Sequence, residues 1–288
     1  MFQKIKLTAF LLISFGSLPL VQPILGQAKP SSTEKSDKQA KSDKQAKPEK
    51  QQKFDLKNLT AEQLAETVIL VYGRREGLAA IRKTEIERGE LQRFAPDGVT
   101  VSEKSVYEKR VMRGENQEKD RIRLDQKLST AQYALVYDAS KIFGIFNNAV
   151  FVPREEAERA FQSTIFHNID ALLRYKENGS TLKLAGKEKQ MGVEFYQLDV
   201  TDKQNFTTRF NISSKLFRVQ SLEYQFSATA AAAPLKYIRK FYDYRNAQGT
   251  FVAWRNVLLA DGKPVEEVNI STVTYGGKID DTEFQVGE

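Results

Sequence analysis

The longest helical pattern in the chain runs from Pro153 to Tyr175. At about 100° per residue, its large apolar side chains fall within one sector roughly 140° wide. Pro153 suits a first helical turn, and the acidic residues after it suit the positive end of the helix dipole. Asn178-Gly179 is typical of a helix end. We therefore expect one amphipathic helix over this range, with an apolar stripe formed by Phe161, Ile165, Phe166, Ile169, Leu172 and Leu173.

This stripe has two interpretations. Most amphipathic helices simply pack on a core, and the stripe then seals the helix onto a sheet. A movable lid over an apolar cavity would use the same residues to contact a ligand chain. Because the stripe is wider than the roughly 100° needed for packing alone, its six residues are the candidate ligand-binding side chains.

Alternating apolar and polar residues flank the predicted helix on both sides, as in strands with one buried and one wet face. They indicate about five strands between residues 80 and 152 and about seven between residues 181 and 275. A shorter helix with a capping box at Thr60 precedes them. Turn pairs such as Asp261-Gly262 predict antiparallel hairpins.

The expected fold class is α+β. It consists of a curled antiparallel sheet of about 11 to 12 strands, an incomplete β-barrel, because a strongly twisted sheet of this size curls. The N-terminal helix and the central helix cover its concave face.

Three segments differ sharply in composition. Residues 1–28 read as a signal peptide, with two lysines before an apolar run at 7–20 that is short for a membrane span. Residues 29–53 are a Lys/Gln/Ala-rich linker with a repeated KSDKQA sequence and no large apolar side chain. Residues 54–288 form the expected folded domain. Since the chain has no cysteine, bacterial lipid attachment is excluded, and we expect a soluble, exported protein in a bacterial periplasm.

Charge and residue types argue against several function classes. Of the formal net charge of +7, six units lie in the first 53 residues, so the folded part has no basic character that would favour nucleic acid. His167 is the single histidine, which leaves no companion for a histidine-based triad or metal site. The sequence contains no phosphate loop and no GxSxG elbow. We therefore expect no catalytic residues, no metal and no cofactor.

A cluster of aromatic residues near the C-terminus has two interpretations. Such side chains can line a lipid or sugar site, or they can pack as cross-strand pairs in a sheet. The cluster comprises Tyr237, Phe241, Tyr242, Tyr244, Phe251 and Trp254.

The C-terminal motifs also resemble a known family. They are Phe-Tyr-Asp-Tyr-Arg at 241–245, Gly-Thr-Phe-Val at 249–252, Asp-Gly at 261–262, and the segment 275–284 beginning Tyr-Gly-Gly-Lys. Together with the order of elements, they resemble the LolA-like outer-membrane lipoprotein-sorting proteins over roughly residues 60–284. The resemblance implies a half-barrel with helices at its mouth that carries lipoprotein acyl chains or other lipids through the periplasm.

The expected function is that of a non-enzymatic periplasmic carrier or chaperone. It would bind a lipidated protein or another acyl-chain ligand in the half-barrel cavity, with lipid or lipoprotein acyl chains and envelope donor and acceptor proteins as partners. We expect a monomer that does not bind nucleic acid. The alternative is an envelope regulatory or scaffold protein that uses the same fold to sense lipids or misassembled proteins.

Overall fold

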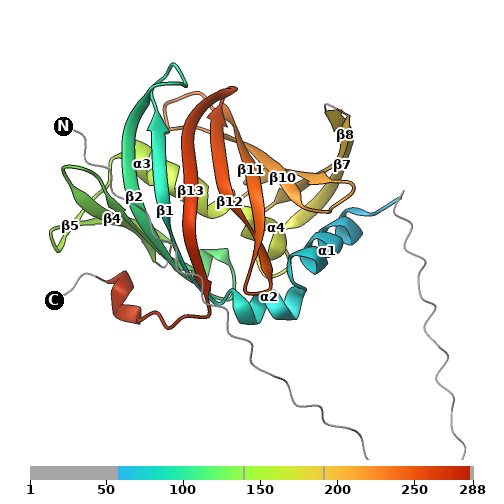
Figure 1. Cartoon of the computed structure of the whole chain (residues 1–288), viewed down its shortest axis with the longest axis horizontal. Coiled ribbons are helices and arrows are strands. Elements are labelled where there is room, and N and C mark those ends of the chain that lie inside the picture. Colours follow the sequence, from blue (N-terminus) through green and yellow to red (C-terminus); the bar gives the residue numbers. More distant parts are fainter. Residues whose placement is uncertain (1–57, 139, 191, 286–288) are drawn as a thin grey trace, which may run out of the picture. The chain divides into compact units, whose positions relative to one another are not determined.

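A computed structural model describes residues 58–138, 140–190 and 192–285. The predicted signal peptide and linker lie outside these residues. The described part of the chain forms a 13-stranded antiparallel sheet with helices packed against it (Figure 1). The predicted α+β class and antiparallel sheet are confirmed, with thirteen strands in place of the expected 11 to 12.

The elements alternate between long series of strands and short groups of helices. The helices are α1 (Ala61–Tyr72), α2 (Arg75–Ile81), α3 (Glu155–Phe166) and α4 (Ile169–Leu173), with 3-10 helices η1 (Gln117–Lys119) and η2 (Asp281–Phe284). The first six strands are β1 (Thr84–Phe94), β2 (Val101–Met112), β3 (Arg121–Lys127), β4 (Gln132–Asp138), β5 (Lys141–Phe146) and β6 (Ala149–Phe151). The others are β7 (Thr181–Gln190), β8 (Val193–Thr201), β9 (Thr207–Ser213), β10 (Val219–Phe226), β11 (Leu235–Ala247), β12 (Thr250–Ala260) and β13 (Lys263–Tyr275).

The sheet joins two series of consecutive hairpins. Its order is β6-β5-β4-β3-β2-β1-β13-β12-β11-β10-β9-β8-β7, so the first and last strands of the chain pair at its centre. Asp261 and Gly262 have φ values of 45° and 85°, as in the primed two-residue turns whose twist matches that of the flanking strands. The hairpin predicted at this pair is confirmed.

The helix expected from Pro153 to Tyr175 is two helices, so the prediction of one continuous helix was wrong. Pro153 lies before the first helical residue, and α3 ends at Phe166. The side chain of Asn168 then accepts hydrogen bonds from the backbone N–H groups of Asp170 (2.8 Å) and Ala171 (3.2 Å). This asparagine is an N-cap that starts α4. Hydrophobic periodicity also missed α2, which lies just before the first expected strand and overlaps it at residues 80–81.

Contacts at the end of α3 show that the sheet is not flat. The Phe166 ring lies 6.3 Å from the ring of Tyr137 in β4 and 5.6 Å from the ring of Phe206, just before β9. β4 and β9 are eight positions apart in the sheet, which in a flat sheet is roughly 38 Å at about 4.8 Å per strand. One phenylalanine reaches both segments only because the two halves of the sheet turn toward each other around α3.

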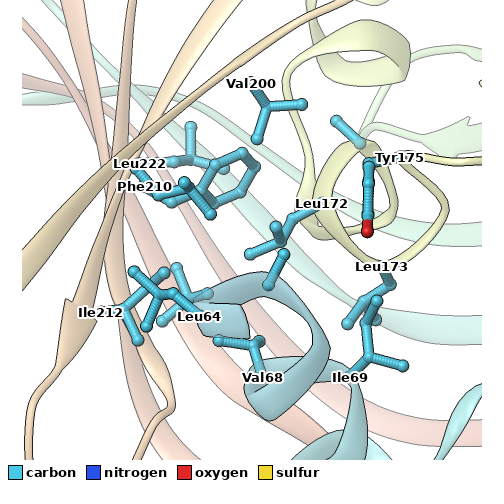
Figure 2. Packing of buried hydrophobic residues seen from close by; sticks show 14 of the residues in the cluster. Leu64, Val68, Ile69, Leu172, Leu173, Tyr175, Val200, Phe210, Ile212 and Leu222 are labelled. Carbon is cyan, nitrogen blue, oxygen red and sulfur yellow. The ribbon is translucent and has the colours of Figure 1, made fainter. Parts of the chain in front are cut away.

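The helices divide the core between the two halves of the sheet. α1 and α4 pack on β8, β9 and β10, where Leu64, Leu172, Phe210, Ile212 and Leu222 form the centre of the largest apolar cluster (Figure 2). The large side chains of α3 instead pack on β2, β3 and β4. No helix in the described ranges is both long and apolar enough to span a membrane.

Candidate ligand-binding cavity

A cavity of about 550 Å³ lies between α3 and the sheet. Its walls come from seven adjacent strands at the centre of the sheet, β4, β3, β2, β1, β13, β12 and β11, and from α3 and the start of α4. This volume is within the range of about 300 to 1,000 Å³ typical of small-molecule sites. The cavity therefore lies where the two halves of the sheet and their separate helix packings meet.

The middle of the cavity is apolar. Leu91 of β1, Leu124 of β3 and the β13 residues Val268 and Ile270 both line the cavity and pack together in one small cluster. Phe251 lines the cavity from β12. These side chains present hydrocarbon surface, and the charged residue nearest to them in register, Lys109 opposite Leu124, is paired with Glu85 and Glu87.

α3 contributes two different faces. Its large stripe residues Phe161 and Ile165 are buried and belong to the cluster packed on β2, β3 and β4. The small residues Ala157, Ala160 and Thr164 are exposed and line the cavity. The stripe thus holds the helix on the sheet, and the small-residue face leaves space beside it.

The structure does not place the six candidate residues on one cavity wall. Phe161 and Ile165 contribute buried parts of the lining, and Ile169 lines it from α4. The other three do not line it: Phe166 packs between the two halves of the sheet, and Leu172 and Leu173 pack in the cluster with α1. The reason is the break at Asn168, which directs α4 toward a different part of the core.

The aromatic cluster divides in a similar way. Phe241, Tyr244 and Phe251 line the cavity, whereas Tyr242 is exposed. Asp243, between them, has a left-handed backbone with φ 54°, which interrupts the strand alternation that would otherwise put Tyr242 and Tyr244 on the same face. Part of the cluster is therefore available to a ligand.

Buried charges close the end of the cavity beside α2. Arg113, just after β2, donates from Nε to Asp170 Oδ2 (2.7 Å) and from Nη2 to Glu85 Oε2 (2.7 Å). Arg82 Nη1 lies 3.2 Å from Asp170 Oδ1, and Lys109 Nζ lies 2.9 Å from Glu85 Oε1. Arg82, Glu85 and Asp170 are all buried. This buried charge network ties α4 to α2, β1 and β2.

The network keeps its acids ionised. Burial alone would raise the pKa of Asp170, but the guanidinium groups of Arg113 and Arg82 outweigh burial and lower that pKa to about 2. For Glu85, burial is likewise outweighed by Lys109 and Arg113, which hold the pKa of this carboxyl below its usual range. Both acids therefore carry a charge at neutral pH, each matched by a cation within the network.

The opposite end of the cavity is polar, and one of its charged side chains reaches solvent. Arg93 there has a side chain that is 37% exposed, compared with 9% for Arg113 at the closed end. Hydrogen bonds, one ion pair and the electrostatic attraction between Arg93 and Glu266 connect polar side chains across β4, β3, β1, β13, β12 and β11. We call this set the polar row; it consists of Tyr133, Gln126, Arg93, Glu266, Asn256 and Arg239.

His167 lies in the wall near the junction of α3 and α4. Its ring stacks on Tyr224 with centroids 3.9 Å apart, and its Nδ1 lies 2.7 Å from Thr208 Oγ1. Burial disfavours the charged imidazolium and lowers the pKa of His167 to about 4. At neutral pH the ring is therefore an uncharged wall residue.

This burial makes stability depend on pH. Below pH 6.5 an unfolded chain protonates His167 but the folded chain does not, so the free energy of unfolding falls as pH decreases toward 4. We expect the free energy of unfolding to fall by about 2 kcal/mol between pH 7 and pH 5. Histidine is the only side chain whose ordinary pKa lies in this range. Urea unfolding across this range should show that slope in the wild type. It should be absent in His167→Phe, which keeps a planar ring against Tyr224; equal slopes would contradict the assignment.

Solved structures share this architecture. A domain from Vibrio parahaemolyticus described as an outer membrane lipoprotein-sorting protein domain superposes with a TM-score of 0.53 at 11% identity, covering 78% of this chain and 95% of its own. A LolA superfamily protein from Nitrosomonas europaea superposes with a TM-score of 0.52 at 10% identity, and the match covers 79% of this chain and 98% of that one. A DUF1329 family protein from Desulfovibrio piger superposes with a TM-score of 0.55 at 10% identity, and the match covers 79% of this chain and 98% of that one.

These similarities establish the fold. No protein-family model matches the sequence, and no curated protein sequence does. The chain has the fold found in the LolA superfamily and in outer membrane lipoprotein-sorting domains. The resemblance inferred from the C-terminal motifs is thus confirmed at the level of the fold.

Proposed function

We propose that this protein is a non-enzymatic carrier that binds an acyl chain of a lipid or lipidated protein in the cavity between α3 and the sheet. The observation that carries the proposal is a cavity of about 550 Å³ whose lining has an apolar cluster between two polar ends. Burying about 16 CH₂ groups contributes roughly 13 kcal/mol. The loss of translational and rotational freedom on binding costs about 4 to 15 kcal/mol. The gain from burying the chain exceeds this cost over most of that range.

The position of the protein in the cell follows from the same proposal. A domain of similar structure is described as an outer membrane lipoprotein-sorting domain, and the sequence begins with the pattern of an exported protein. We infer that the protein works in the periplasm, where an acyl chain needs shelter from water between two membranes. Envelope proteins that deliver and receive the ligand are the partners this role requires.

The charged groups near the cavity support binding rather than catalysis. At the closed end, Arg113, Asp170 and Glu85 are engaged with one another. The imidazole of His167 is stacked on Tyr224, and its pKa of about 4 is far below the range suited to a general base at neutral pH.

Lipid analysis tests the proposal. Protein isolated under mild conditions from its own cells is extracted with organic solvent, and the extract is analysed by mass spectrometry. We expect an acyl lipid at close to one molecule per chain, and saturable one-to-one binding of a fluorescent acyl probe after the lipid is removed. A lipid-free protein that binds no acyl probe would contradict the proposed function.

A further inference from the structure

The polar row contains a buried hydrogen-bond donor with no partner. Gln126 of β3 is only 1% exposed and lines the cavity. Its Nε2 has no hydrogen-bond partner among the described residues. A buried polar group without a partner is costly to stability, so this donor marks a place where a ligand atom would be bound.

The neighbours of Gln126 fix the direction of its amide. Arg93 Nη2 donates to Gln126 Oε1 at 3.4 Å, and Tyr133 OH donates to the same oxygen at 3.2 Å. A guanidinium has donors only, so the amide oxygen must face Arg93. The NH₂ group of Gln126 is therefore left as a donor, and it requires an acceptor oxygen.

The charges of the polar row are already paired. Arg239 Nη2 lies 3.3 Å from Glu266 Oε1, and Arg93 forms an ion pair with Glu103. Each guanidinium thus has a carboxylate partner, and a ligand carboxylate would enter beside two negative side chains. Because both cations are already paired, a ligand carboxylate would be taken out of water without a cation of its own, which is costly, whereas an uncharged carbonyl needs only the free donor.

The order of groups along the cavity sets the orientation of the ligand. Leu124, two residues before Gln126 on the same strand, belongs to the apolar middle, and Arg93 lies toward solvent. A chain in the apolar middle therefore places its first carbonyl at the level of Gln126 and the rest of its head at the end near Arg93.

We propose that the polar row is a headgroup subsite that selects uncharged acyl esters, such as acylglycerols, over free fatty acids of the same chain length. This inference rests on the proposed function, because it assigns the head of the ligand whose chain that function places in the cavity. Gln126 Nε2 donates to the ester carbonyl oxygen, and the paired charges of the polar row leave no cation to balance a ligand carboxylate.

The test compares three probes with a 16-carbon chain by displacement of a fluorescent acyl probe: monopalmitoylglycerol, palmitate and 1-hexadecanol, which has no carbonyl. The wild type should bind the ester about tenfold more tightly than palmitate. Gln126→Glu keeps the shape and the acceptor oxygen but replaces the donor. It should lose about tenfold in affinity for the ester, whose carbonyl can only accept, and change less than about threefold for the alcohol, whose hydroxyl can turn and donate to the new carboxylate.

Two further variants complete the experiment. Gln132→Glu makes the same change at an exposed residue of β4 that does not line the cavity, and it should bind all three probes as the wild type does. Gln126→Met removes the donor without adding charge, and it should lose the ester preference even if Gln126→Glu fails to fold.

The outcomes separate the two proposals. If the wild type binds ester and palmitate equally, or if the Gln126 variants lose affinity equally for all three probes, the headgroup subsite is wrong and the carrier function stands. If the wild type binds none of the three probes, the proposed function itself fails, and the subsite with it.

Discussion

Replacing Arg113 with methionine is expected to lower the free energy of unfolding by about 3 to 5 kcal/mol, the cost of removing one partner from a buried ion pair. Arg113 contacts Asp170 and Glu85 at once, and all three side chains are at most 12% exposed. Methionine fills much of the same volume but leaves two buried carboxylates with only Arg82 and Lys109 to balance them.

Urea denaturation at pH 7 measures this loss, and a surface pair provides the control. Arg255 forms an ion pair with Glu267, but its side chain is 44% exposed, so Arg255→Met should cost less than about 1 kcal/mol. Adding Asp170→Asn to Arg113→Met should recover part of the stability, because it removes one of the unpaired charges. Equal losses for the two arginine variants would show that the buried charge network does not hold the closed end together.

Introducing tryptophan at Ala160 is expected to abolish most acyl binding while leaving the protein folded. Ala160 is exposed on the small-residue face of α3 and lines the cavity, so an indole there occupies space meant for the chain. Excluding even a few CH₂ groups, at about 0.8 kcal/mol each, lowers affinity by at least about tenfold. Because the residue is not packed in the core, the melting temperature should change little.

The matched control is Ala79→Trp. Ala79 is an exposed alanine in α2 that does not line the cavity, so the substitution adds the same side chain without blocking the site. Titration of both variants with a fluorescent acyl probe, alongside thermal melts, separates blockage from unfolding. Wild-type affinity in Ala160→Trp would mean that the chain binds elsewhere.

Much of the fold could be predicted because its signals are local. The Asp261-Gly262 pair specifies a primed turn by itself, and the observed φ values agree. The capping box at Thr60 and Gln63 forms in the structure as expected. Strand alternation and successive turns then predict an antiparallel sheet. This prediction does not require knowing that strands far apart in the sequence, such as β1 and β13, pair with each other.

The central helix shows where local reasoning fails. The stripe containing Phe161 and Ile165 identified a buried face correctly, but a periodic pattern cannot distinguish a face that binds a sheet from a face that binds a ligand. Asn168 could have revealed the break, because asparagine is among the preferred N-cap residues. The apolar residues on both sides of it concealed that signal.

Other parts of the cavity lining escaped the sequence analysis for a different reason. Ala157 and Ala160 line the cavity precisely because they are small, and small residues carry little weight in a hydrophobic pattern. The buried charge network joins Arg113 to Asp170, 57 residues apart in the sequence. No spacing rule connects two such residues until the sheet brings β2 and α4 together.

The position of a bound chain is the most direct test of the central claim. Protein with ¹³C-labelled methyl groups is mixed with unlabelled monopalmitoylglycerol, and nuclear Overhauser effects between ligand and protein are recorded. We expect contacts from the acyl methylenes to the methyl groups of Leu91, Val268 and Ile270, and none to Leu172 in the cluster with α1. Contacts confined to exposed residues such as Val150, or none at all, would contradict binding in this cavity.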